Sequence, residues 1–161
     1  MEHLEKRLSQ HKLEVKWIHV ADLPAEDLMR ARFGSAAIVE ANRLVEQADA
    51  VVVASPVYKA SYTGLLKSYL DMLPQKGLAG KLTVPVMMGG TMAHLLAIDY
   101  ALKPVLSAIG ATHQLQGVYA IDSQVVRTED GAYAIEDELI ARLDALAEQV
   151  RAQLGQQAVI A

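Results

Sequence analysis

The sequence predicts one α/β domain in which helices cover both faces of a parallel β-sheet. Three observations support this fold class. Apolar segments of strand length alternate with amphipathic segments of helical length, as in sheets built from right-handed crossover connections. The stretch at 50–54 is continuously apolar, which is typical of a strand covered on both faces. The chain has 161 residues, 52% of them hydrophobic, which is enough for a single core.

The predicted order of elements begins with a helix rather than a strand. Leu4 and Leu8 recur at helical spacing and predict a helix over 1–11, whereas the alternation from Leu13 to Val20 predicts a strand. The remaining predicted elements are, in order, a helical turn at 26–33, a helix at 35–48 capped by Ser35, a strand at 50–54, a loop at 55–61, a helix at 62–73, a strand at 82–88, a helix at 92–109, a strand at 115–121, a loop at 122–132 and a helix at 135–154.

Pro104 lies inside the predicted helix at 92–109. A proline there removes one backbone N–H and crowds the carbonyl four residues earlier, which belongs to Tyr100. The sequence therefore predicts a kink or a single π-turn near Tyr100.

The composition argues against several functional classes. A net charge of −4 disfavours a nucleic-acid-binding surface, and the absence of cysteine excludes disulfides and thiolate catalysis. We expect no metal site, because His3, His11, His19, His94 and His113 lack the spacing of metal ligands. No apolar run reaches the roughly 18 residues that span a bilayer, and no apolar signal sequence follows the charged start. We expect a cytoplasmic protein without nucleic-acid or membrane partners.

Two predicted corners between a strand and a helix carry the candidate binding residues. The first, SPVYKASYTG at 55–64, combines a proline, several hydroxyl groups and the rings of Tyr58 and Tyr62. The second, at 87–91, contains paired glycines that allow a tight turn. Open α/β sheets bind ligands at the carboxyl ends of their strands. One corner would supply an aromatic surface and the other backbone N–H groups, so the pair predicts a site for a flat ring rich in hydrogen-bond acceptors.

Three long motifs closely resemble those of NADPH-dependent FMN reductases, and most nearly the alkanesulfonate FMN reductase branch. They are SPVYKASYTGLLKSYLD at 55–71, GGTMAHLLAIDYALKPVLSAIGA at 89–111 and GVYAIDSQV at 117–125. The resemblance extends from about Leu4 to Val126. It implies a flavodoxin-like, doubly wound sheet in three α/β/α layers, formed by the single domain 1–161.

The resemblance also implies where FMN binds. The loop after the strand at 50–54 would pack along the isoalloxazine ring, and the glycine-rich loop after 82–88 would hold its pyrimidine edge. The residues carried over are Pro56, Val57, Tyr58, Lys59 and Ser61 in the first loop and Gly89, Gly90 and Thr91 in the second, with Asp122 and Ser123 as further candidate contacts. No side chain is implied as a catalytic acid or base, because the flavin and the nicotinamide carry the chemistry and the protein orients them.

The sequence departs from the family pattern at its amino terminus. Family members begin with a strand and a Gly-Ser-Pro-Arg type loop that binds the FMN phosphate, whereas Met1 aligns inside the helix that follows. The first strand is then absent from this chain, the expected sheet order is 2-gap-3-4-5, and the edges beside the gap are unpaired. We expect residues upstream of Met1 in the natural protein, which a measurement of its intact mass would test.

The implied activity is hydride transfer from NADPH, or from NADH, to FMN. Reduced FMN would then pass to a partner flavin-dependent monooxygenase. Alternatives are a quinone or azo reductase that keeps its FMN, and a flavodoxin-like electron carrier. Members of this branch carry a π-helical tyrosine where subunits meet, so we expect Tyr100 at the interface of a homodimer or homotetramer.

Overall fold

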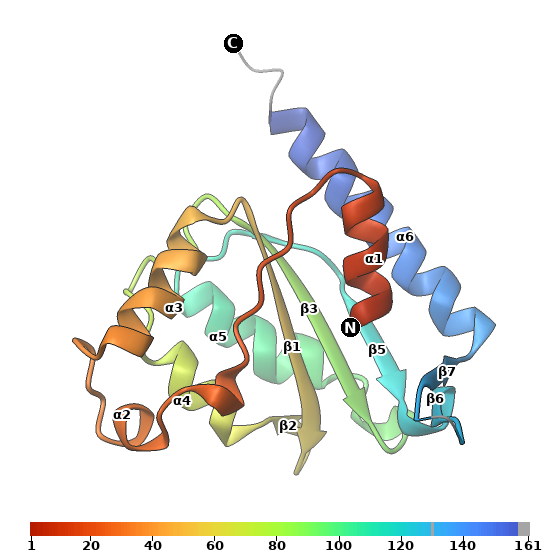
Figure 1. Ribbon diagram of the computed structural model, residues 1–161, viewed down its shortest axis with the longest axis horizontal. Coiled ribbons are helices and arrows are strands. Elements are labelled where there is room, and N and C mark those ends of the chain that lie inside the picture. Colours follow the sequence, from red (N-terminus) through yellow and green to blue (C-terminus); the bar gives the residue numbers. More distant parts are fainter. Residues whose placement is uncertain (130, 158–161) are drawn as a thin grey trace.

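The computed structural model describes residues 1–129 and 131–157, and its centre is a parallel sheet (Figure 1). The parallel strands are β1 (Ala50–Tyr58), β3 (Leu82–Gly89), β4 (His113–Gln114) and β5 (Val118–Ile121). In the register of the sheet, β3 has β1 on one side and both β4 and β5 on the other. The carboxyl ends of β1, β3 and β5 therefore lie together at one edge, as the predicted fold class requires.

Helices cover both faces of this sheet, which confirms the three-layer architecture (Figure 1). They are α1 (Glu2–Gln10), α2 (Ala25–Met29), α3 (Ala36–Gln47), α4 (Gly64–Leu70), α5 (Lys103–Ala108) and α6 (Asp137–Gln157), with short 3₁₀ turns η1 (Val20–Asp22), η2 (Met92–His94) and η4 (Asp122–Gln124). Met87 points into a core cluster with α3, α4 and α5, whereas Val86 points into another with α1 and α6. Within the described residues, no helix has both the length and the apolar character of a membrane span.

The central strand contains a proline at the point where the sheet is interrupted. Pro85 lacks an N–H for the ladder, and it lies between the part of β3 that pairs with β4 and the part that pairs with β5. Gly117, at this interruption, has a φ of +84°, and a Cβ there would clash with the carbonyl oxygen of Pro85. The strand predicted at 115–121 is therefore shorter than expected: only β5, at Val118–Ile121, falls within it, and the separate short strand β4 precedes it at His113–Gln114.

The prediction of a strand from Leu13 to Val20 is wrong, because the structure contains no strand there. Leu13 and Val15 pack against the core cluster of α1 and α6, whereas Ile18 and Val20 pack against the opposite cluster. The alternation therefore determines which face each side chain occupies. Among the described residues, however, no strand pairs with this segment, and a β-ladder requires a paired neighbour.

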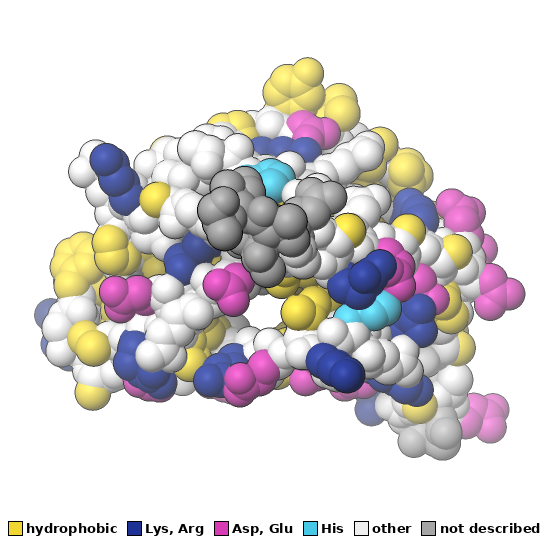
Figure 2. All heavy atoms as spheres, turned by 90° about the horizontal axis from the view of Figure 1, so that it is seen from above, with side chains coloured by type: hydrophobic (Ala, Val, Ile, Leu, Met, Phe, Trp, Pro, Cys, Tyr) yellow, Lys and Arg dark blue, Asp and Glu magenta, His cyan; other side chains and the backbone are white. Residues whose placement is uncertain are grey.

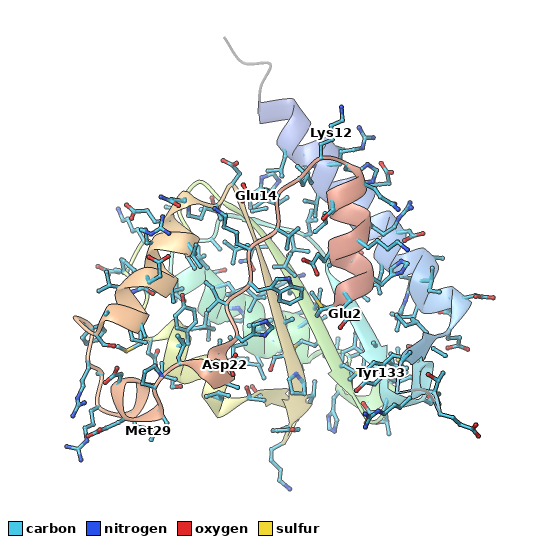
Figure 3. All side chains as sticks on the ribbon, viewed as in Figure 1. Glu2, Lys12, Glu14, Asp22, Met29 and Tyr133 are labelled. Atoms are coloured by element: carbon cyan, nitrogen blue, oxygen red, sulfur yellow. The ribbon has the colours of Figure 1, made fainter. Side chains whose placement is uncertain are left out.

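One edge of β1 is unpaired along Ala50–Pro56. Among the residues that the structure describes, β1 pairs with β3 and, through Val57 and Tyr58 alone, with the short strand β2 (Ser61–Tyr62). Figure 3 shows the 13–20 segment passing in front of β1. Seen from above, the molecule is hollowed between the sheet and the front layer that carries this segment (Figure 2). The unpaired edge expected beside the gap is thus present.

Two segments predicted as loops contain short antiparallel hairpins. β1 continues to Tyr58 and turns at Lys59 and Ala60, whose φ angles are +52° and +64°, before β2 begins. The loop predicted at 122–132 is wrong in the same way, since it contains η4, β6 (Val125–Arg127) and the turn to β7 (Tyr133–Ile135). Neither Lys59 nor Ala60 favours a positive φ, so the first hairpin lacks the usual turn signal.

The helix predicted at 92–109 is formed by three pieces: η2, a π-turn η3 (Ile98–Leu102) and α5. Tyr100 lies in the middle of the π-turn, which confirms the expectation drawn from Pro104. Pro104 itself lies in the first turn of α5, directly after the π-turn, so its missing N–H falls where the two helical pieces meet.

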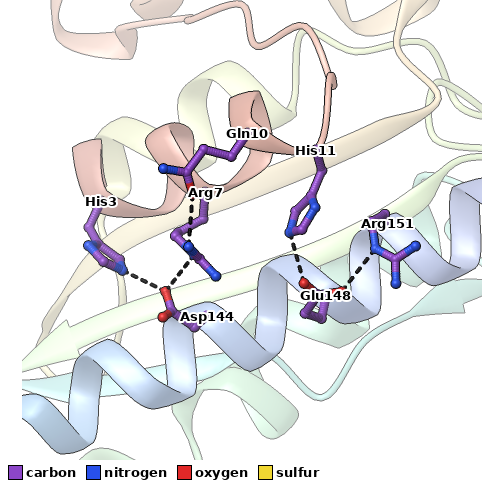
Figure 4. Close-up of polar contacts among 7 residues, drawn as sticks. All are labelled: His3, Arg7, Gln10, His11, Asp144, Glu148 and Arg151. Carbon is purple, nitrogen blue, oxygen red and sulfur yellow. Dashed lines mark hydrogen bonds and ion pairs between the residues drawn. The ribbon is translucent and has the colours of Figure 1, made fainter.

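The α1 helix is attached to α6 by two buried leucines, Leu4 and Leu8, and by polar contacts (Figure 4). The polar contacts between the first eleven residues and α6 are His3–Asp144 (2.7 Å), Arg7–Asp144 (3.0 Å) and His11–Glu148 (3.0 Å), and Glu148 also pairs with Arg151 of its own helix at 2.9 Å. The hydrogen bond from Arg151 lowers the pKa of Glu148, and the nearby charges of His11 and Arg7 lower it further.

Candidate functional site

The two predicted corners meet at the carboxyl-terminal edge of the sheet. In the sheet register, Pro56 of β1 is beside Met88 of β3, and Gly89 is beside Ile121 of β5. A Cβ on Gly89 would lie 3.2 Å from the Cβ of Val57, so the corners are in direct contact. This contact makes the edge the candidate site, because open α/β sheets bind ligands where their strands end.

Ser55 joins the first corner to the helix that follows it. Its side chain is buried, and its hydroxyl donates a hydrogen bond to the carbonyl oxygen of Pro56 at 2.8 Å. The hydroxyl oxygen of Ser55 also accepts a hydrogen bond from the backbone N–H of Thr63 at 3.1 Å, and the Thr63 hydroxyl in turn caps α4 by accepting the N–H of Leu66. Ser55 therefore ties the end of β1 to the start of α4 and fixes both ends of the intervening hairpin.

The hairpin itself presents its side chains to solvent. Pro56, Tyr58 and Lys59 are exposed, Tyr58 at 66%, whereas Val57 and Ser61 are partly buried. Positive φ angles at residues other than glycine carry a conformational cost, and such strain often accompanies a functional site. An aromatic ring, a proline ring and an ammonium group are thus available to a ligand at this corner.

The second corner has no space for a side chain at Gly89. This residue is buried, and a Cβ would clash with the hydroxyl of Tyr119 and closely approach Val57. Glycine is required there because its neighbours already fill the space. The next two residues, Gly90 and Thr91, are exposed, so the corner offers mainly its backbone to a ligand.

The third strand, β5, adds a phenol and a carboxylate to this corner. Tyr119 donates its hydroxyl proton to the carbonyl oxygen of Thr91 at 2.8 Å. Burial, together with the negative charge of Asp122, raises the pKa of Tyr119, so the phenol stays protonated. An Asp122 carboxylate oxygen lies 3.8 Å from the position of a Cβ on Gly90, where it can accept a hydrogen bond from a ligand beside that glycine.

Exposed apolar side chains gather on the elements that follow the carboxyl ends of β1 and β3. These residues, which we call the apolar rim, are Tyr58, Leu65, Met88, Met92, Leu95, Leu96 and Tyr100. An open pocket of about 350 Å³ lies between the β1–β2 hairpin and the π-turn, lined by Ala60, His94 and Tyr100 among others. Tyr100 is 79% exposed. Apolar surface of this kind marks sites of contact with other molecules.

A second open pocket, of about 510 Å³, lies beside the amino-terminal end of β3, between α3 and the 73–81 segment. Two of its basic side chains are already engaged. Lys81 donates to the carbonyl oxygens at the end of α3, and Arg43 forms a salt bridge with Glu40. We assign no site there, despite the larger volume, because the pocket lies away from the carboxyl ends of the strands.

Eight of the residues predicted to bind FMN lie at the two corners, which the structure brings together, and the further candidates Asp122 and Ser123 lie in η4, directly after β5. His94 lines the open pocket and is exposed. Sequence reasoning missed the supporting roles of Ser55 and Tyr119. A serine at the end of an apolar strand was an available signal for Ser55, whereas the bond from Tyr119 to Thr91 joins segments far apart in the chain.

These groups fit a flat heteroaromatic ring such as the isoalloxazine of FMN. The rings at the first corner offer flat surfaces, and the glycines at the second allow close approach to the backbone. Asp122 supplies an acceptor for a ring N–H. The described His, Asp and Glu side chains form no cluster that could hold a metal ion. The site is therefore suited to binding and orienting a flat ring.

Comparisons with known proteins agree with this geometry. A family model for NADPH-dependent FMN reductases matches residues 1–125. An FMN reductase (NADPH) of Pseudomonas putida is 50% identical over 129 residues, which are 80% of this chain and 66% of that protein. The chain thus spans just under two thirds of the length of this relative.

Solved structures support the same assignment. The apo crystal structure of an NADH:FMN oxidoreductase (EMOB) superposes with a TM-score of 0.83 at 38% identity, covering 94% of this chain and 79% of that one. A flavodoxin from the domain Archaea superposes with a TM-score of 0.63 at 13% identity, covering 96% of this chain and 87% of that one, and this likeness shows the flavodoxin-like fold. By its matched residues and its fold, the chain belongs to the NADPH-dependent FMN reductase family.

Proposed function

We propose that this protein catalyses the reduction of FMN by a reduced nicotinamide at the carboxyl-terminal edge of its sheet. The observation that supports the proposal is the close approach of Val57 to Gly89, which brings the two corners together at one edge of the sheet. Hydride passes from the nicotinamide to the flavin ring, and this chemistry belongs to the two cofactors. The chain's own part is to hold the rings in a reactive orientation.

Each corner has a distinct role in this proposal. Pro56, Val57 and Tyr58 pack along the flavin ring, while Lys59 and Ser61 supply polar contacts from the hairpin. Gly89, Gly90 and Thr91 offer backbone groups to the pyrimidine edge, and Asp122 and Ser123 lie at the adjoining strand end. No side chain of the site is assigned as a catalytic acid or base.

We infer that NADPH is the principal reductant and that NADH can replace it. The P. putida relative is named for NADPH, whereas the superposed crystal structure is titled for NADH. Reduced nicotinamides are available in the cytoplasm, where we place the protein.

We further infer that reduced FMN leaves for a flavin-dependent monooxygenase. The exposure of Tyr58, Gly90 and Thr91 supports this step, because a flavin at such an open edge can dissociate. We expect the apolar rim to be covered by a second copy of the chain, in a homodimer or homotetramer. The 79% exposure of the Tyr100 side chain supports an interface there.

The test is NADPH oxidation followed by absorbance, with and without added FMN. We expect turnover that requires free FMN and saturates with it. Turnover that requires an added quinone or azo dye, in protein that keeps its flavin, would favour a flavin-retaining reductase. Flavin-loaded protein that does not oxidise NADPH or NADH would favour an electron carrier. Light scattering of wild-type protein and of Tyr100→Glu tests the interface, because a buried charge there should yield monomers.

A further inference from the structure

Tyr119 joins β5 to the turn that follows β3. Its side chain is 2% exposed, and its hydroxyl donates a hydrogen bond to the carbonyl oxygen of Thr91 at 2.8 Å. The same hydroxyl occupies the space that a Cβ on Gly89 would need. One side chain from the neighbouring strand therefore contacts both ends of the Gly89–Thr91 turn.

Thr91 is held on a second side by its own side chain. Its Oγ1 accepts the backbone N–H of Ala93 at 3.3 Å, at the start of η2. The rest of the turn is exposed, and a glycine such as Gly90 leaves the backbone many accessible conformations. The bond from Tyr119 is therefore a specific restraint on an otherwise adaptable turn.

Tyr119 can donate its hydrogen bond to Thr91 only while its phenol is neutral. The side chain of Tyr119 is buried in the core cluster of α3, α4 and α5, and the charge of Asp122 lies nearby. Both effects favour the protonated form, as the raised pKa of Tyr119 indicates. The hydrogen bond to Thr91 therefore persists across the neutral pH range.

We propose that Tyr119 is a positioning residue for flavin: its hydroxyl holds the Gly89–Thr91 turn in the shape that receives the ring. The inference rests on the proposed function and adds a residue to it. Because Tyr119 is buried, it acts through Thr91 rather than on the reacting atoms. Its loss should therefore weaken FMN binding and raise KM for FMN while leaving kcat unchanged.

The test is Tyr119→Phe, with Tyr69→Phe as the matched control. Both tyrosines are buried, at 2% and 4% exposure, but the hydroxyl of Tyr69 has no hydrogen-bond partner among the described residues. FMN binding is measured by the quenching of flavin fluorescence, and KM and kcat by NADPH oxidation. Hydrogen exchange of the backbone amides at 89–93, in protein without flavin, reports whether the turn is held.

We expect Tyr119→Phe to raise Kd and KM for FMN about fivefold, the effect of losing one hydrogen bond, and to accelerate exchange at 89–93. The control should match wild type in all of these measurements. If Tyr119→Phe binds FMN as tightly as the control, the inference is overturned and the proposed function stands. If wild-type protein neither binds nor reduces FMN, the proposed function fails and the inference fails with it.

If the Tyr119→Phe protein does not fold, a second variant tests the same inference. Gly89→Ala places a methyl group against the Tyr119 hydroxyl and should displace it from Thr91. We expect the same acceleration of amide exchange at 89–93. Unchanged exchange in Gly89→Ala would overturn the inference without any flavin measurement.

Discussion

The strand β3 and the segment 13–20 both have strand-like sequences, but only β3 forms a strand in the structure. β3 is paired with β1 on one side and with β4 and β5 on the other. The 13–20 segment sends alternate side chains into the two core clusters, yet no described strand pairs with it. Hydrophobic alternation thus decides which face a side chain occupies, whereas strand formation also requires hydrogen-bonded neighbours.

Of the changes considered, proline substitution should give the largest difference in lost stability between the two regions. Thr83 is fully buried in β3 and paired with neighbours on both sides, so Thr83→Pro should lower the free energy of unfolding by about 3 kcal/mol or more. Lys16 is exposed in the unpaired segment, so Lys16→Pro should cost less than about 0.5 kcal/mol. Urea denaturation measures both values. An equal loss of stability would mean that the 13–20 segment is paired in solution.

Two glycines outside β3, Gly117 and Gly80, test how tightly the neighbouring chain packs against this strand. Gly117 and Gly80 both have positive φ, at +84° and +75°, but only Gly117 is packed against β3, through Pro85. Gly117→Ala should therefore cost roughly 2–4 kcal/mol, the left-handed strain plus a steric clash. Gly80→Ala has open space and should cost only about 1 kcal/mol. Similar values in thermal or urea unfolding would show that the break between β4 and β5 is not tightly packed.

The hairpin after β1 offers a stabilising change. Replacing Lys59 by Asn and Ala60 by Gly would put residues that tolerate positive φ into the turn, and we expect a gain of about 1 kcal/mol. The same double variant should weaken FMN binding slightly, because Lys59 is lost. Lys59→Arg alone is the control for the charge. A loss of stability in the double variant would contradict the observed turn geometry.

The smallest effect concerns the anchoring of α1, which holds one end of the 13–20 segment. The pKa of Glu148 is lowered by its contacts, so its contribution to stability is present at neutral pH and is lost as the pH falls through that lowered value. Glu148→Gln should therefore be slightly less stable than wild type at pH 7, and the difference should shrink towards pH 3. Melting temperatures at the two pH values test this, with exposed Glu46→Gln as the control. A difference as large at pH 3 as at pH 7 would contradict the assignment.

Much of the fold followed from local patterns in the sequence. The apolar run at 50–54 and the glycines at 89–90 predicted the two corners, and Pro104 predicted the π-turn at Tyr100. These features depend on residues close together in the chain, whose conformational preferences are known.

The features that were not predicted depend on contacts between residues far apart in the chain, or on residues that adopt backbone conformations they usually disfavour. No pattern within 13–20 reveals whether a neighbouring strand will pair with it. Lys59 and Ala60 adopt a turn that usually selects glycine or asparagine. Tyr119 reaches Thr91 only after the sheet has assembled, so its role could not be derived from spacing.

The unpaired edge of β1 has a consequence for the behaviour of the protein in concentrated solution. Backbone N–H and C=O groups along such an edge form a template onto which a strand from another molecule can add. The 13–20 segment passes in front of β1 (Figure 3), and we expect it to obstruct such an addition. Resistance to aggregation should therefore depend on how firmly α1 keeps that segment in place, which links colloidal stability to the two leucines that α1 buries on α6.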